Sequence, residues 1–264
     1  MSNFLTEIFQ VLQPWIPHLL PVSIVLFVFQ KFGGSHIQPW FFSKVYSPLL
    51  SDYHVKYRSI KKEHFDSMKN HVSADLALRK KGALRILEIG PGPGYNFEFY
   101  PANSELTVVE VNPFFEEQFF KKQVEHPYII MDRFVVGYAE NMKDVPDNSV
   151  DVVVSTIMLC SVRSIEGALQ EIRRVLVPGG KYYYWEHIRD YDNFWVRFVQ
   201  NLLSYTTHDL VFGCRLNRKT DEVIKANKCG FSSVEQKRFR TPLQPGFGQL
   251  RVIHSAHVKG IATK

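Results

Sequence analysis

The sequence predicts an α/β domain in which helices cover both faces of a parallel sheet. Three observations support this prediction: strand and helix patterns alternate after residue 83, a glycine-rich turn follows the first strand, and two late strands are close enough in sequence to pair antiparallel. The chain has 264 residues, of which 45% are hydrophobic, so it can form a proper core as one large domain.

The alternating segments can be placed in order along the chain. Strands are expected at Arg85–Ile89, Thr107–Val111, Arg133–Ala139, Val150–Thr156 and 181–188, and two more around 231–239 and 250–259. Helices are expected from near Pro93, over 112–126, over 165–176 and near 218–228. The β-α-β repetition with short turns gives the parallel sheet, and the last two strands form a C-terminal antiparallel hairpin.

Residues 1–30 are a separate hydrophobic segment. The run Trp15–Phe29 has no formal charge, and as a helix it would span roughly 22 Å, less than a hydrocarbon core of about 30 Å. Three prolines, at positions 14, 17 and 21, disfavour one straight helix. We expect a monotopic or hairpin membrane anchor, with a buried core helix as the alternative.

A cleaved signal peptide fits this segment less well. The one charged side chain before Lys31 is Glu7, and no small-x-small cleavage site follows. Lysines and arginines after the segment predict that the following chain faces the cytosol. Residues 31–82 mix aromatic and charged side chains and are expected to be a linker with lid helices, and residues 83–264 are the main domain.

Charge and cysteine content disfavour several classes of function. The formal net charge of +6 is a modest basic excess, which more often reflects a solvated surface than nucleic-acid binding. Cys160, Cys214 and Cys229 form no C-x-x-C pair and no sequence cluster with histidine, so we expect neither a disulfide framework nor a metal site. Cys160 and Cys214 are interpreted as core or pocket-lining residues.

The turn after the first strand has the pattern E-x-G-x-G-x-G, formed by Glu88, Gly90, Gly92 and Gly94. Glycine lets a ligand approach the backbone closely, and ligands of open α/β sheets bind beyond the carboxyl ends of the strands. A phosphate-binding P-loop would need Lys-Ser or Lys-Thr after the glycines, and a G-x-G-x-x-G fingerprint would need glycine where Tyr95 stands. Both alternatives are therefore excluded by spacing.

Three further features accompany the glycine turn. Glu110 ends the second strand, where a carboxylate can accept hydrogen bonds from both hydroxyls of a ribose. The triplet AEN (139–141) follows the third strand, where it can flank an adenine ring. The stretch LQEIRRVLVPGGKYYYWEH is a helix that leads through Pro-Gly-Gly into a strand.

Together these elements resemble the class I S-adenosylmethionine-dependent methyltransferases, which implies a Rossmann-like sheet and S-adenosylmethionine as cofactor. The segments NFEFYP (96–101), RFVVGYAENM (133–142), DVVVSTIMLCSV (151–162) and WEH (185–187) resemble the membrane-anchored thiol methyltransferases of the methyltransferase-like seven family. That resemblance implies small alkyl thiols as substrates and a location on the endoplasmic reticulum membrane and lipid droplets. The chain departs from this family at Pro91-Gly92-Pro93, where the family has Cys-Gly-Thr.

The resemblance also implies which residues form the cofactor pocket. These are Glu88, Gly90, Gly92, Gly94, Asn96, Glu110, Val111, Ala139, Glu140 and Thr156.

A thiol acceptor must ionise before it can attack a methyl group, and a nearby histidine could take its proton. The candidates are His187, after the fifth strand, and His208, before a Gly-Cys pair that the resembling family shares. Two other functions stay open: methylation of another small lipophilic O or N acceptor, and a non-catalytic membrane or lipid-droplet protein that keeps the fold. A nucleic-acid substrate is disfavoured because no Asn/Asp-Pro-Pro-aromatic motif follows the fourth strand.

Overall fold

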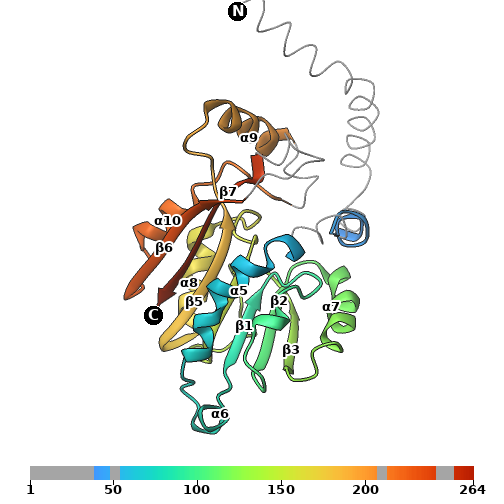
Figure 1. The fold of residues 1–264 in the computed structure, drawn as a ribbon, viewed down its shortest axis with the longest axis vertical. Helices are drawn as coiled ribbons and strands as arrows, with labels where there is room; N and C mark the ends of the chain where they lie inside the picture. The colour runs from blue at the N-terminus through green and yellow to red at the C-terminus, as the bar shows by residue number, and fades with distance from the viewer. Residues whose placement is uncertain (1–38, 48–53, 207–212, 242–252) are drawn as a thin grey trace, which may run out of the picture.

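The computed structural model describes residues 39–47, 54–206, 213–241 and 253–264 (Figure 1). In this part of the chain, seven strands form one sheet in the order β3-β2-β1-β4-β5-β7-β6. The first five strands pair in parallel, and β7 pairs antiparallel with both β5 and β6. The strands are β1 (Arg85–Ile89), β2 (Glu105–Glu110), β3 (Ile130–Val136), β4 (Val150–Thr156), β5 (Leu176–His187), β6 (Ser233–Arg240) and β7 (Ala256–Thr263).

All seven expected strands are present, and the parallel sheet with a C-terminal antiparallel hairpin is confirmed. The α-helices are α5 (Arg58–Asp66), α6 (Leu76–Lys80), α7 (Glu116–Gln123), α8 (Ile165–Val175), α9 (Phe194–Thr206) and α10 (Thr220–Ala226). The shorter helical turns are η1 (Phe42–Tyr46), η2 (Ser67–Asn70), η3 (Phe97–Phe99) and η4 (Pro113–Phe115).

Two hydrophobic clusters lie on opposite faces of the sheet, because successive side chains of a strand point to opposite sides. Val153 of β4 packs with Leu169 and Ile172 of α8 on one face. Val152 and Val154 pack with side chains of α5, η2 and η3 on the other face. In Figure 1, α5 and α8 cover opposite sides of the central strands. Strand β4 is therefore buried on both faces.

The prediction of a helix that starts near Pro93 is wrong. Turns occupy this region and lead into the short 3-10 helix η3. Gly92 and Gly94 have φ angles of +54° and +89°, which lie outside the right-handed helical region. The glycine turn therefore stays a loop and does not open into an α-helix.

The anchor expected over residues 1–30 lies outside the described residues. The described part contains no helix that is both long and apolar enough to cross a bilayer.

Candidate active site

The glycine loop follows β1 at the carboxyl edge of the sheet, as expected. A Cβ atom on Gly90 would lie 2.8 Å from Cγ of Met158, and one on Gly94 would collide with the ring of Phe97. A Cβ on Gly92 would meet nothing closer than 4.0 Å. Gly92 is thus the position that leaves space for a ligand above the backbone. At Gly94 the Phe97 ring fills the side where a Cβ would lie.

Glu110 lies against this loop from the end of β2. Its Oε2 atom accepts a hydrogen bond from the Gly92 N–H at 3.0 Å, and Oε1 accepts one from the Asn112 N–H at 2.9 Å. Burial raises the pKa of Glu110 to about 7, although these backbone hydrogen bonds oppose the shift. Each carboxylate oxygen still has acceptor capacity beyond the bond it makes.

A second buried carboxylate, Glu88, forms a network across β1 and β4. The Asn96 Nδ2 atom donates to Glu88 Oε1 at 2.7 Å and to Thr156 Oγ1 at 2.9 Å. The Tyr100 hydroxyl lies beside Glu88 and Asn96, but Glu88 Oε2 and Asn96 Oδ1 make no well-aligned hydrogen bond within the described residues. Burial raises the pKa of Glu88, against the effect of Tyr100, Asn96 and the nearby Lys61.

Lys61 is a buried cation that the sequence analysis did not single out. It lies on α5, its side chain is 1% exposed, and burial lowers its pKa to about 8 while Glu88 and Glu98 oppose the shift. Its Nζ atom lies 3.3 Å from Nδ1 of His54, whose ring stacks on Tyr95 of the glycine loop. His54 and Lys61 therefore lie against the glycine loop. A lysine in an amphipathic helix gave no sequence signal for this burial.

The remaining cofactor candidates lie along the same edge. Glu140 accepts hydrogen bonds from the N–H groups of Arg163 and Ser164, at 2.5 and 3.2 Å, and so ties its loop to the start of α8. Ala139 is buried beside it, and Val111, directly after β2, is 37% exposed. The structure thus brings the predicted cofactor residues to the ends of β1, β2, β3 and β4.

The loop after β4 is held by Glu186, another buried carboxylate that sequence reasoning missed. Glu186 Oε2 accepts hydrogen bonds from the N–H groups of Met158 and Leu159, at 2.9 and 3.0 Å, while Oε1 accepts from Ser155 Oγ at 2.7 Å. Ile157 has a φ angle of +55°, which is strained for a β-branched residue. The path of this loop is therefore fixed by polar contacts that outweigh local strain.

His187, one of the two proposed proton acceptors, is buried at the end of β5. Burial, together with His257 and His254, lowers the pKa of His187 well below its usual value. The structure places it beside Cys160 and Cys214, with the ligand atoms of all three residues within 4.8 Å of one another. His208, the other candidate, lies outside the described residues.

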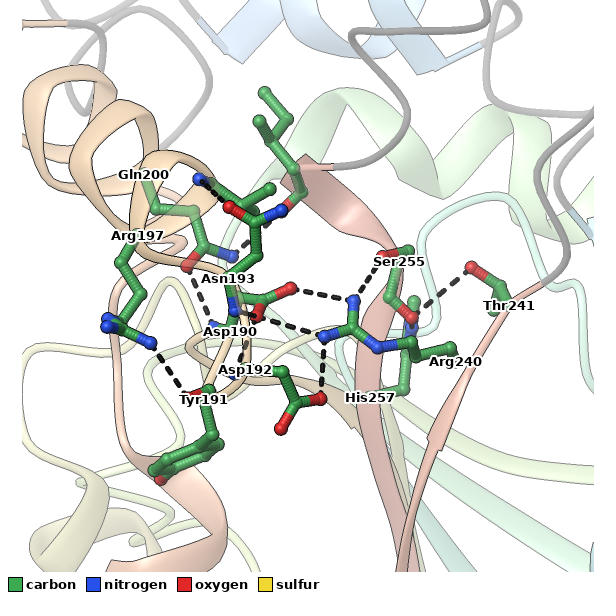
Figure 2. Close-up of polar contacts among 12 residues, drawn as sticks. Asp190, Tyr191, Asp192, Asn193, Arg197, Gln200, Arg240, Thr241, Ser255 and His257 are labelled. Carbon is green, nitrogen blue, oxygen red and sulfur yellow. Dashed lines mark hydrogen bonds and ion pairs between the residues drawn. The ribbon is translucent and has the colours of Figure 1, made fainter.

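The start of helix α9 is tied to β6 and to the residues before β7 by the polar cluster in Figure 2. Arg240 donates from Nη1 and Nη2 to the two carboxylate oxygens of Asp190, at 2.7 and 2.9 Å, and also to Asp192. Asn193 caps the helix by accepting from the Trp195 N–H. Gln200 on α9 joins the Asp190 N–H to the carbonyl of Ile253. These contacts fix where α9 begins.

Comparison with known proteins agrees with this geometry. Residues 87–184 match the model of a methyltransferase domain. The chain is 37% identical to the human thiol S-methyltransferase TMT1A over 191 residues, which is 72% of this chain and 78% of that protein. It is 36% identical to the rat thiol S-methyltransferase TMT1B over 195 residues, which is 74% of this chain and 77% of that protein.

Solved structures share the fold. A chain from the complex between the Haloferax volcanii Trm112 methyltransferase activator and a methyltransferase has a TM-score of 0.59, at 13% identity, covering 86% of this chain and 96% of that one. The [4+2]-cyclase SpnF has a TM-score of 0.50 at 15% identity, covering 69% and 74%. On the sequence identity to TMT1A and TMT1B, this chain belongs to the family of the thiol S-methyltransferases.

Proposed function

We propose that the protein methylates the sulfur of small lipophilic thiols, with S-adenosylmethionine as methyl donor. The observation that supports the acceptor class is the identity of 36–37% to proteins named thiol S-methyltransferases. Bound S-adenosylmethionine supplies an electrophilic methyl group. The protein's own part is to bind the cofactor, to align the acceptor sulfur with it, and to keep water away.

The residues at the glycine loop fit this cofactor. Gly92 leaves room above the backbone, and Glu110 has acceptor capacity left for the two ribose hydroxyls. Glu88 Oε2 and Asn96 Oδ1 are buried acceptors without a well-aligned partner in the described part of the chain. They would hold the ammonium group of the cofactor, since a buried acceptor is stabilised by a charged donor.

The acceptor thiol must lose its proton, and we assign this step to His208 or His187. Burial lowers the pKa of His187 well below its usual value, so its ring is neutral at pH 7 but is a weaker base than an exposed histidine. The pocket walls would come from the aromatic-rich stretch before residue 66 and from the region around α9.

We further propose that the enzyme works at the cytosolic face of the endoplasmic reticulum membrane or on lipid droplets. The uncharged run 15–29 supports this location. So does α9, where Phe194, Trp195 and Phe198 are 60%, 54% and 54% exposed. Large exposed aromatic side chains on one helix are typical of an interfacial surface. Lipophilic thiols would then reach the pocket from the bilayer.

One experiment tests the reaction. The purified full-length protein is given methyl-labelled S-adenosylmethionine with a panel of alkyl and aryl thiols, amines, phenols and RNA. We expect methylated thiols and little label in the other acceptors. Label on an amine or a phenol instead would overturn the sulfur assignment, and binding of the cofactor without any transfer would favour a non-catalytic protein.

A further inference from the structure

Cys160, His187 and Cys214 come together at the carboxyl ends of β4 and β5, although they are far apart in sequence. Their three potential ligand atoms lie within 4.8 Å of one another, and the two Sγ atoms are 3.5 Å apart. Tetrahedral zinc, with Zn–S of about 2.3 Å and Zn–N of about 2.0–2.1 Å, requires neighbouring ligand atoms roughly 3.3–3.8 Å apart. The cluster is thus close to the spacing of a zinc site before any ion is bound.

The backbone that presents these side chains is held in place by several contacts. Glu186 binds the loop before Cys160, as described above. Arg218 donates from its guanidinium to the carbonyls of Leu159 and Val162 on either side of Cys160. The Arg215 N–H donates to the Cys160 carbonyl at 3.0 Å, which joins the two cysteine-bearing loops. Such outer contacts are what orients the ligands of a metal site.

The set of ligand atoms also suits a zinc ion. Arg218 lies close enough to Cys160 and Cys214 for its positive charge to interact with both. The hydrogen bond with Cys214 and burial nevertheless raise the pKa of the Cys160 thiol well above its usual value, so that binding of a metal would release this proton. Two sulfur ligands and one nitrogen ligand are the set that a catalytic zinc ion uses when it keeps one position for substrate.

We propose that Cys160, Cys214 and His187 bind one Zn²⁺ ion, and that its fourth position takes the sulfur of the substrate thiol. This inference rests on the proposed thiol methyltransferase function. On binding, the S–H bond breaks, the sulfur keeps the electron pair and binds the ion as a thiolate, and the proton passes to solvent; no oxidation occurs. In this arrangement His187 is a ligand of the ion and does not act as a base.

The position of the Cys160, Cys214 and His187 cluster relative to the glycine loop supports the proposed binding of the substrate thiol to the ion. Cys160 lies in the same loop that starts at Thr156, and Thr156 accepts a hydrogen bond from Asn96 behind the glycine turn. The cluster and the cofactor residues therefore share the carboxyl edge of β1, β4 and β5, where α/β enzymes bring their reactants together. A thiolate held there would be near the cofactor pocket.

The test uses full-length protein, purified in detergent with a phosphine reductant, which supplies no competing thiol. Zn²⁺ content is measured by mass spectrometry, and Co²⁺ is exchanged in to give the visible absorption of a thiolate-bound tetrahedral ion. We expect about one ion per chain in the wild type and in the control Cys229→Ser. Cys160→Ser, Cys214→Ser and His187→Ala should each weaken binding by more than the roughly 10–100-fold of outer-shell changes.

Binding of a thiol at the fourth position of the ion can be measured separately. Titration of the Co²⁺ protein with propanethiol, without S-adenosylmethionine, should shift the Co²⁺ absorption and saturate, whereas propanol should not. His254 lies near His187, with ring centroids 5.4 Å apart, so His254→Ala and His208→Ala are included. Loss of the metal in either variant would mean a closed four-ligand site and would overturn the substrate position.

Other outcomes separate this inference from the proposed function. No stoichiometric metal, or a Cys160–Cys214 disulfide under reductant, overturns the metal site; if thiol methylation persists in the same preparation, the proposed function stands. Metal binding without transfer to any thiol would instead overturn the proposed function. Each variant is checked for S-adenosylmethionine binding, so that a variant that fails to fold is recognised and replaced by Cys→Ala or His→Gln.

Discussion

At the scale of single residues, Glu110 combines burial with an elevated pKa of about 7 at the point where a ribose would bind. In the cofactor-free protein its carboxyl group is therefore partly protonated at neutral pH. Hydrogen bonds from ribose hydroxyls favour the charged form, so cofactor binding should shift this equilibrium toward the carboxylate.

Glu110→Ala should weaken S-adenosylmethionine binding by about 1.5–3 kcal/mol, the range of hydrogen bonds to a charged group. In the wild type, affinity should fall roughly tenfold per pH unit below pH 7, because the bound state then requires loss of a proton, and it should level off above pH 8. Calorimetry at pH 6, 7 and 8 measures both effects. Glu110→Gln, which has no proton to lose, should show no such slope; unchanged affinity in the alanine variant would remove Glu110 from the site.

The proton acceptor can be identified with thiols of graded acidity. Replacing the correct histidine, His208 or His187, with alanine should slow turnover by about 10²–10⁴-fold with little change in cofactor affinity. The loss should shrink for acidic thiols, which are already ionised at neutral pH. Rates for wild type and both variants are compared across the series. An equal loss for all thiols would mean that the histidine positions the substrate and does not deprotonate it.

At the scale of elements, two glycines of the same loop are needed for different reasons, one for ligand access and the other for packing. Gly92 and Gly94 both have positive φ, but a Cβ on Gly94 would collide with the Phe97 ring, whereas one on Gly92 would meet only the Phe115 ring at 4.0 Å. One glycine therefore leaves space for a ligand, and the other is needed for the loop to pack on η3.

Gly94→Ala should destabilise the protein by about 1–3 kcal/mol through overpacking on Phe97, with strain at positive φ adding about 1–2 kcal/mol. Gly92→Ala should lower the stability only by the strain at positive φ, but it should also weaken cofactor binding. Thermal unfolding with and without S-adenosylmethionine distinguishes the two. Similar losses of stability in both variants would contradict the difference in packing.

Arg240 of β6 holds the segment before α9 through its bonds to Asp190 and Asp192 (Figure 2). Its carboxylate partner Asp190 is fully buried, while the Arg240 side chain is 43% exposed. Arg240→Ala should cost about 1.5–3 kcal/mol and speed hydrogen exchange in α9 more than in β1 or β4. Lys122→Ala, which breaks an exposed pair with Glu125, should cost less than about 1 kcal/mol. Uniform exchange across all elements would argue against a local role.

At the scale of the whole molecule, the described residues by themselves form a hydrophobic cluster on each face of the sheet. The hydrophobic clusters on both faces of the sheet are built from residues 65 onward. The described N-terminal segments pack on this domain: Gln118 donates to the Ser43 carbonyl at 3.1 Å, and Asn112 donates to the Pro39 carbonyl at 2.9 Å.

Deletion of residues 1–30 should therefore release the protein to the soluble fraction and leave S-adenosylmethionine binding intact. Flotation with phospholipid vesicles and calorimetry on the truncated protein check the two parts. Residual vesicle binding by the truncated form would point to the exposed aromatics of α9, and Phe198→Ser tests that contribution. A truncated protein that fails to fold would show that the segment is core and that the anchor hypothesis is wrong.

The sequence by itself determined the order of the strands along the chain, the parallel sheet with its antiparallel hairpin and the glycine turn after the first strand, because hydrophobic periodicity and turn residues are local properties. The pattern of Glu88, the glycines and Glu110 could also be found from the sequence, since its residues lie at fixed offsets from strand ends. Tertiary structure alone decided the rest. It turned the expected helix near Pro93 into a loop, buried Lys61, gave Glu186 its partners, and brought Cys160 to Cys214 and His187. Such contacts join residues distant in sequence, and their spacing follows from packing.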